Sequence, residues 1–294
     1  MALLASFRGV FTAMVTPFTD DGAAVSEVRL RAYCDFLIER GIRGLFVFGT
    51  TGEWTLLAEA ERTDGARILA QQARKRVPVI VHAGAHATAQ AVRLAMGARE
   101  AGADAVSLIS PPFFPLDDDA LFNHFTTVAR AVTGFPVLLY NIPKFAGNDL
   151  SPALILRVAK QADNVIGLKY SGDNLNRFRE YRRIMGPDFS LFNGNDSLAL
   201  PALHEGADGL VSGNASAWPE LLAALYELFR DGRYREAADK QRELDDFINA
   251  CDPSCTLSSF KAMLANRGVP VGDVRAPLKR VGEEGRAALR RLLP

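Results

Sequence analysis

The stretch Asn164-Val-Ile-Gly-Leu-Lys169 is a short apolar run that ends on a charged side chain. A second run, Phe135-Pro-Val-Leu-Leu-Tyr-Asn141, comes one unit earlier in the chain and ends on a tyrosine and an asparagine. Runs of this length that are apolar at nearly every position are typical of strands buried on both faces, as in a parallel sheet covered by helices. The two runs therefore predict an α/β fold.

Six further runs of this kind occur along the chain, and amphipathic stretches of helical length separate all of them. Eight strand-and-helix units in succession predict a (β/α)8 TIM barrel rather than an open, doubly wound sheet. No Gly-x-Gly-x-x-Gly follows the first run, which also disfavours a dinucleotide-binding fold. The expected strands are Gly9–Thr16, Gly44–Phe48, Val77–His82, Ala103–Ile109, Pro136–Asn141, Val165–Lys169, Phe189–Asn193 and Gly209–Ser212.

Helical patterns continue after the last expected strand, over Trp218–Arg230, Tyr234–Ala250, Thr256–Asn266 and Glu283–Leu292. They exceed what the eighth unit of a barrel needs, and no linker rich in glycine, serine or proline separates them from it. We therefore expect residues 1–230 to form the barrel and residues 231–294 to form a C-terminal helical extension packed on it.

The composition excludes several classes of protein. The 294 residues contain 34 Lys plus Arg and 34 Asp plus Glu, so no basic excess indicates a nucleic-acid partner. No apolar run approaches the length of a membrane span, and residues 1–8 lack the basic start and long apolar core of a signal peptide. Three cysteines suit a reducing compartment better than a disulfide framework. The expected location is the cytoplasm.

Metal and cofactor sites are not expected. Cys251 and Cys255 have no second pair of ligands, which makes a zinc site improbable. His82 and His86 have no carboxylate cluster on neighbouring strand ends, so a hydrogen-bonded structural role is favoured over a metal role.

Lys169 and Tyr140 are the candidate catalytic residues, because in TIM barrels the C-terminal ends of the strands line the active site. Burial disfavours the charged form of a lysine and leaves a neutral amine, the nucleophile that forms a Schiff base with a carbonyl substrate. A neighbouring phenol can carry the protons of such a reaction. Structural roles are the alternative: Lys169 could pair with Glu53 or Asp196, and Tyr140 could be a core tyrosine.

The segment Gly49-Thr-Thr-Gly-Glu53 follows the second expected strand. Its glycines would let the backbone approach a ligand, and its N–H groups and two hydroxyls could bind a carboxylate. The alternative is a plain turn from strand to helix. Nucleotide binding is not supported, because the Gly-Lys-Ser/Thr ending of a P-loop is missing.

Three motifs together resemble the signatures of the dihydrodipicolinate synthase / N-acetylneuraminate lyase family: Gly49-Thr-Thr-Gly-Glu53, Tyr140-Asn-Ile-Pro143 and Val165-Ile-Gly-Leu-Lys169. The resemblance runs from about Gly9 to the final helices. It implies class I pyruvate chemistry on a (β/α)8 barrel with a C-terminal helical region, commonly as a homotetramer.

The same resemblance implies roles for individual residues. Lys169 would form the imine with the keto carbon of pyruvate or of another 2-keto acid. Tyr140, aided by the hydroxyl of Thr51, would donate and accept protons. Thr50 and Thr51 would hold the substrate carboxylate, and the backbone at Val211 would border the pyruvyl group. The expected substrate-binding residues are Thr50, Gly52, Ser171, Gly194, Asp196 and Val211.

The chain also departs from the family patterns. Phe145 stands where the synthases carry an arginine for the carboxylate region of the second substrate. Pro112-Phe-Phe-Pro115 lacks the tyrosines that the synthases tend to place there, one of which enters the site of a partner subunit. Sialic-acid lyases often have an Asp-Glu pair where this chain has Asp196-Ser197. A shorter 2-keto-3-deoxy sugar acid fits better, held by Asn195, Asp196, Ser171 and Ser197.

The leading prediction is thus a Schiff-base-forming, pyruvate-dependent lyase that acts on a 2-keto-3-deoxy sugar acid. A keto-sugar-acid dehydratase, a 4-hydroxy-tetrahydrodipicolinate synthase that uses pyruvate and aspartate semialdehyde, and a non-catalytic binder of keto acids stay open as alternatives. A phosphorylated substrate is disfavoured, because Gly194-Asn195 and Gly213-Asn214, after the last two strands, have no basic neighbour in their loops.

Overall fold

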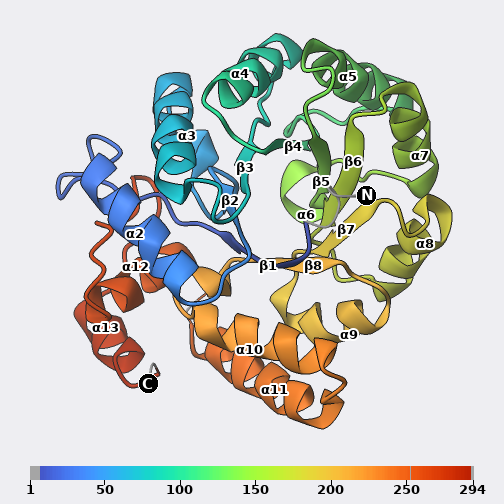
Figure 1. Ribbon diagram of the computed structural model, residues 1–294. Helices are drawn as coiled ribbons and strands as arrows, with labels where there is room; N and C mark the ends of the chain where they lie inside the picture. Colours follow the sequence, from blue (N-terminus) through green and yellow to red (C-terminus); the bar gives the residue numbers. More distant parts are fainter. Residues whose placement is uncertain (1–6, 252, 293–294) are drawn as a thin grey trace.

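The structure is a computed structural model that describes residues 7–251 and 253–292. Eight parallel strands pair in chain order, and the eighth pairs with the first, so the sheet closes into a barrel (Figure 1). The predicted (β/α)8 barrel is therefore confirmed. The strands are β1 (Gly9–Ala13), β2 (Gly44–Val47), β3 (Val79–His82), β4 (Ala105–Ile109), β5 (Val137–Asn141), β6 (Val165–Tyr170), β7 (Ser190–Asn193) and β8 (Gly209–Ser212).

Helices surround the barrel on its outer side (Figure 1). Asp117, Ser151 and Asn174 each accept a hydrogen bond from a backbone N–H three residues on, which fixes the starts of three of them. The helices are α2 (Glu27–Glu39), α3 (Glu59–Ala73), α4 (Thr88–Glu100), α5 (Asp118–Ala131), α7 (Pro152–Gln161), α8 (Leu175–Met185), α9 (Ala199–His204), α10 (Pro219–Arg230), α11 (Tyr234–Ala250), α12 (Thr256–Asn266) and α13 (Glu283–Leu289).

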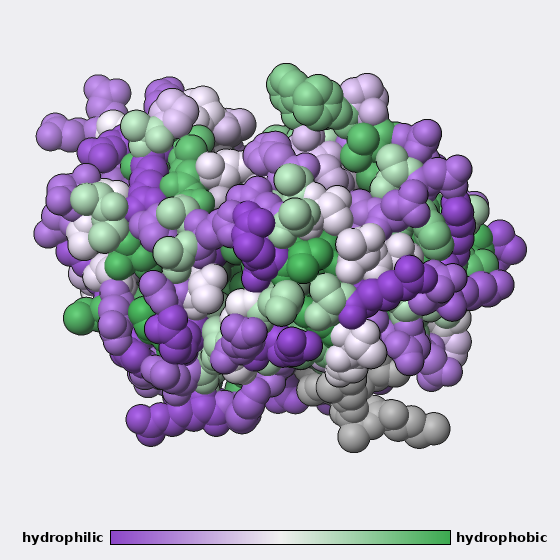
Figure 2. Space-filling model, turned by 90° about the horizontal axis from the view of Figure 1, so that it is seen from above, coloured by the Kyte–Doolittle hydropathy of each residue, from purple (hydrophilic) through white to green (hydrophobic). Residues whose placement is uncertain are grey.

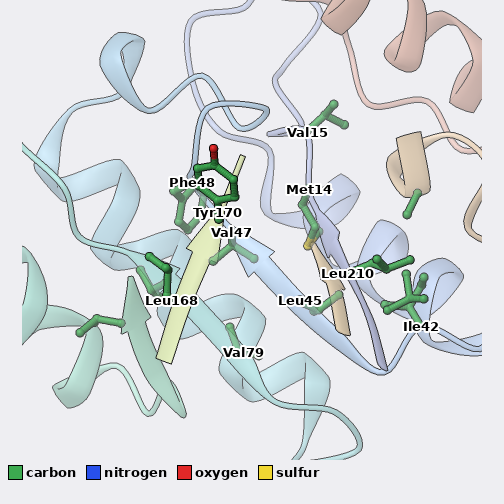
Figure 3. Packing of buried hydrophobic residues seen from close by; sticks show 14 of the residues in the cluster. Met14, Val15, Ile42, Leu45, Val47, Phe48, Val79, Leu168, Tyr170 and Leu210 are labelled. Carbon is green, nitrogen blue, oxygen red and sulfur yellow. The ribbon is translucent and has the colours of Figure 1, made fainter. Parts of the chain in front are cut away.

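Alternate side chains of each strand point outward to the helices and inward to the barrel axis. The outward side chains, such as Leu45, Val47 and Leu168, belong to the large core between strands and helices (Figure 3). The inward ones form a second, smaller core. Because both faces of every strand are buried, the runs are apolar throughout. The inner core includes Phe11, Phe46, Ile80, Leu138, Tyr140, Phe192 and Val211.

Short helices at the mouth of the barrel were not predicted: η1 (Trp54–Leu56), α6 (Pro143–Ala146) and η3 (Asn214–Ser216). A fourth short turn, η2 (Asp196–Leu198), directly precedes α9. Segments of three or four residues are too short to show a helical period. These four turns follow β2, β5, β8 and β7, and they shape the face on which a barrel carries its active site.

A buried ion pair joins this face to the C-terminal helices. The Nζ of Lys261, on α12, lies 2.7 Å from Oε1 of Glu53, and the two side chains are 1% and 0% exposed. The backbone N–H of Arg275 donates to the other carboxylate oxygen of Glu53 at 2.9 Å. Burial lowers the pKa of Lys261, and the Glu53 carboxylate opposes that shift. The carboxylate that ends the Gly49–Glu53 loop is therefore used to hold the chain after α11.

Arg275 makes a second connection in the same region. Its guanidinium donates to both carboxylate oxygens of Glu61, at 2.8 and 2.6 Å, and to the carbonyl of Leu56. It also lies 4.3 Å from the centroid of the Phe18 ring. Contacts of this kind bind residues 256–279 to the barrel mouth, while the division of the chain at residue 230 stays a prediction.

No helix within 7–251 and 253–292 combines the length and the apolar character needed to cross a bilayer. The expected lack of a signal peptide rests on residues 1–8, and residues 1–6 lie outside the described part of the chain.

We predict that Lys261→Met destabilises the protein strongly. Removing one partner leaves the Glu53 carboxylate buried without its counter-ion, which costs about 3–5 kcal/mol. Urea unfolding followed by circular dichroism should show that decrease. The double variant Lys261→Met/Glu53→Gln should recover part of the loss, because neither charge is then buried. Lys240→Met, which breaks a surface pair with Glu243, should cost less than about 1 kcal/mol. A double variant no more stable than Lys261→Met would contradict the prediction.

Candidate active site

Lys169 lies on β6 and is almost fully buried, with 4% of its surface exposed. Its Nζ is 4.3 Å from the ring centroid of Phe46 and 4.3 Å from that of Tyr140. The structural alternative for this lysine is not observed in the described residues: Glu53 pairs with Lys261, and no ion pair joins Lys169 to Asp196. Two aromatic faces, rather than a carboxylate, therefore surround the amine.

Tyr140 lies directly beside Lys169, because the two residues are register partners on β5 and β6. Its hydroxyl is 3.5 Å from Oγ1 of Thr50, at the long limit of a hydrogen bond. Sequence analysis assigned the assisting hydroxyl to Thr51, and the structure places Thr50 there instead. Thr51 lies against Gly213: a Cβ added to Gly213 would lie 3.3 Å from Oγ1 of Thr51. Neighbouring residues of this tight turn point to different sides, which the sequence did not reveal.

Gly194 and Ser171 lie next to the lysine. A Cβ at Gly194 would collide with Oγ of Ser171 and come 2.7 Å from Cε of Lys169. The glycine is required here because two side chains pass close to its backbone. Oγ of Ser171 is buried and has no hydrogen-bond partner within the described residues. The structure thus brings together Lys169, Tyr140, Thr50, Ser171 and Gly194.

Asp196 is held by the loop after β8. Its Oδ2 accepts hydrogen bonds from Ser212 Oγ at 2.9 Å and from the backbone and side-chain nitrogens of Asn214 at 3.2 and 2.6 Å. Burial raises the pKa of Asp196, and those hydrogen bonds oppose the shift. The neighbouring Asn195 amide donates to the carbonyl of Gly172. Both side chains are therefore engaged within the protein, and substrate binding by them stays a prediction.

The remaining expected residues border the site through their backbone or packing. The carbonyl of Gly52 accepts a hydrogen bond of 2.7 Å from Thr16, and a Cβ at Gly52 would lie 2.9 Å from Cα of Phe48. Gly52 thus packs on the barrel backbone. Val211 faces the barrel interior in the same core as Tyr140.

His82 was expected to have a hydrogen-bonded structural role. Its ring is fully buried and lies beside the backbone of Ser107, which hydrogen-bonds to it. The ring lies 5.9 Å from that of Tyr140. Burial, reinforced by the charges of Arg62 and Lys169, lowers the pKa of His82 well below its usual value. A neutral imidazole therefore packs behind Tyr140. Side chains alternate between the two faces of a strand, so His82 lies on the same inward face of β3 as Ile80. This alternation is the sequence feature that could have predicted its position.

A pocket of about 650 Å³ includes Thr50 in its wall, and the hydroxyl of Thr50 is 3.5 Å from that of Tyr140. The rest of the wall comes from the neighbouring loop and turn after β2, from Phe145 of α6 and from the chain after α11. Phe145, at the position of the missing arginine, is 65% exposed. Lys144, the residue before Phe145 on α6, is not part of this pocket wall.

Fold and site together define a (β/α)8-barrel protein with a buried lysine–tyrosine pair at the C-terminal mouth and a pocket beside it. No cluster of three or more His, Cys, Asp or Glu side chains suited to a metal ion is found in the described ranges.

Comparison with known proteins identifies the family. A model described as the dihydrodipicolinate synthetase family matches residues 6–294, and this chain belongs to that family. A 4-hydroxy-tetrahydrodipicolinate synthase of Methanopyrus kandleri is 33% identical, over 97% of this chain and 95% of its own length. Members of the family are class I, pyruvate-dependent lyases and aldolases, and this protein is an enzyme of that type.

Two solved structures are closely similar. YagE, a prophage protein of E. coli K12 in complex with pyruvate, is 30% identical with a TM-score of 0.92, and 97% of each chain is covered. A catalytic-lysine mutant of a Ruminococcus gnavus sialic acid aldolase is 26% identical with a TM-score of 0.95, covering 98% of this chain and 95% of that one.

We predict that Gly194→Ala slows imine formation with pyruvate. The added methyl group must displace Lys169 or Ser171, and a displacement of about 1 Å at a reacting group can cost roughly 100-fold in rate. Borohydride trapping at timed intervals measures this rate. Gly282→Ala is the matched control, because no atom lies within 4 Å of a Cβ at that position. Equal trapping rates for both variants would count against the described geometry.

Proposed function

We propose that this protein is an aldolase that makes or cleaves the C–C bond of a 4-hydroxy-2-keto acid, with pyruvate and an aldehyde as the two fragments. The 2-keto-3-deoxy sugar acids predicted from the sequence belong to this class of compound. The observation that carries the proposal is the Lys169 amine, buried between the rings of Phe46 and Tyr140 without a carboxylate partner among the described residues.

The reaction follows from these groups. Lys169 Nζ adds to the keto carbon of pyruvate, and water leaves as the imine forms. A proton then leaves the methyl carbon through the hydroxyl pair of Tyr140 and Thr50, which gives an enamine. The enamine carbon bonds to the aldehyde carbon, whose oxygen takes the proton back from Tyr140. One water hydrolyses the imine, which restores the amine and releases the product. Cleavage is the reverse.

Other residues would orient the substrate. The backbone and hydroxyls of Thr50 and Thr51 would hold the pyruvate carboxylate, with Val211 beside the pyruvyl group. The unpartnered hydroxyl of Ser171 would bind the oxygen on the fourth carbon of the substrate, because a buried hydroxyl without a partner is costly and a ligand oxygen can supply one.

A 4-hydroxy-tetrahydrodipicolinate synthase is the second candidate, since curated relatives over 30% identical carry that name. Phe145 argues against it, because an aromatic ring cannot provide the two parallel hydrogen bonds by which an arginine holds a carboxylate. Dehydration of a sugar acid would use the same imine, and product analysis separates it from cleavage.

The proposal is tested by trapping. Pyruvate followed by borohydride should leave a reduced pyruvyl adduct on Lys169, found by peptide mass spectrometry. The Lys169→Ala variant should carry none, and the Lys144→Ala variant should be labelled like the unmodified protein. Absence of an adduct from folded, unmodified protein would refute the imine mechanism and favour a non-catalytic keto-acid binder.

We also propose a cytoplasmic homotetramer. The support lies in two neighbouring aromatic side chains after β4: Phe113 and Phe114 are 84% and 68% exposed, with ring centroids 5.0 Å apart. Figure 2 shows that hydrophobic residues gather in several places on one face of the molecule, among hydrophilic ones. Adjacent exposed aromatic rings are typical of surfaces that a partner covers.

Replacing both rings should weaken that assembly. The Phe113→Ser/Phe114→Ser variant is expected to show a smaller mass by light scattering than the unmodified tetramer, because the covered apolar area is lost. Val28→Ser removes an isolated exposed side chain and should leave the mass unchanged. An unmodified protein of monomeric mass would contradict the proposal.

A further inference from the structure

Thr50 belongs both to the wall of the pocket and to the hydroxyl pair with Tyr140. One end of the pocket therefore lies at the hydroxyl pair to which the proposed mechanism assigns the proton transfers. The group attached to the aldehyde carbon must extend into it, and about 650 Å³ is enough for a group as large as an aromatic ring.

Polar groups at the base of the pocket are already bound within the protein. Glu53 is paired with Lys261. The hydroxyl of Ser258 donates to Asp273 at 2.7 Å and accepts from the backbone N–H of Val281 at 2.9 Å. These two wall residues have satisfied hydrogen-bond requirements without a ligand.

The outer polar groups are engaged as well. Nζ of Lys279 donates to Oγ of Ser254 at 2.9 Å, and the hydroxyl of Thr256 is 3.5 Å from the carbonyl of Pro253. Hydroxyls of a polyhydroxylated chain would compete with these contacts for the same donors and acceptors. One unpaired buried hydroxyl lowers affinity roughly tenfold or more.

Apolar side chains face the same space. Phe145 and Leu278 are 65% and 38% exposed in the free protein, and both line the pocket. Leu56, Leu257 and Phe260 complete this apolar wall. Covering such side chains with an apolar group is favourable, whereas covering them with hydroxyls is not.

We propose that the aldehyde partner carries an apolar alkyl or aryl group, which binds between Phe145 and Leu278. This inference rests on the proposed aldolase function and narrows its substrate. The bond formed joins the methyl carbon of pyruvate to the aldehyde carbon, and the product is a 4-hydroxy-2-keto acid with an apolar tail. Ser171 then binds the single hydroxyl of that product.

The test compares two aldehydes that have the same number of non-hydrogen atoms, pentanal and D-glyceraldehyde, with benzaldehyde as an aryl probe. Each is incubated with pyruvate and the unmodified enzyme, and the 4-hydroxy-2-keto acid is measured by mass spectrometry. We expect kcat/KM for pentanal or benzaldehyde to exceed that for D-glyceraldehyde at least tenfold. Equal values, or a preference for D-glyceraldehyde, would overturn the inference.

A variant separates binding in the pocket from the different reactivities of the aldehydes. Phe145→Asn should lower the ratio of kcat/KM for pentanal to that for D-glyceraldehyde by about tenfold, because it removes apolar area that pentanal covers. Val28→Asn, an exposed position on α2, should leave the ratio unchanged. An unchanged ratio in Phe145→Asn would overturn the inference.

Failure of the inference and failure of the proposed function give different results. Trapping of pyruvate alone on Lys169 depends on the imine mechanism and not on the aldehyde. An adduct together with a preference for D-glyceraldehyde removes the apolar substrate and keeps the aldolase. No adduct removes both.

Discussion

The ion pair between Glu53 and Lys261 is the constraint on which the site depends. Two charges that are fully removed from water are tolerated only when their partners are well placed, and removal of either partner is costly. Here the Lys261 ammonium also donates to the carbonyl of Asp273 and lies 4.1 Å from the Phe18 ring centroid. The Gly49–Glu53 loop is therefore fixed at its end, and Thr50 is positioned at the Tyr140 hydroxyl.

The two buried lysines of the barrel mouth have opposite surroundings. Lys261 has a carboxylate at 2.7 Å, which stabilises its charged form. Lys169 is buried to a similar extent but lies between two aromatic rings. Ring faces offer a cation less stabilisation than a carboxylate does, and they leave the nitrogen free to bond to carbon. The same residue type thus holds the structure together at one position, and at the other it has the surroundings that the proposed imine chemistry requires.

Sequence reasoning located Lys169, Tyr140 and the eight strands because these features are local. Each strand is an apolar run, and the residue that ends it lies at the barrel mouth. The ion pair of Glu53 with Lys261 could not be predicted from the sequence, because Lys261 lies on α12, far along the chain. Thr51 was chosen over Thr50 because spacing does not show which way adjacent turn residues point. The α6 turn and the packing of His82 beside Tyr140 likewise depend on tertiary contacts.

The two ends of the site are built from different parts of the chain. This difference explains why membership of the family does not identify the second substrate. The pyruvate end is built from strand ends of the barrel, which the fold fixes. The wall of the pocket comes from residues 50–56, from Phe145 of α6 and from the chain after α11, which packs at the mouth through Glu53, Lys261 and Arg275. Substitutions in these segments change the wall without moving Lys169. On the inference drawn above, substrate choice resides in side chains such as Phe145 and Leu278, and a fold shared with many enzymes carries no information about them.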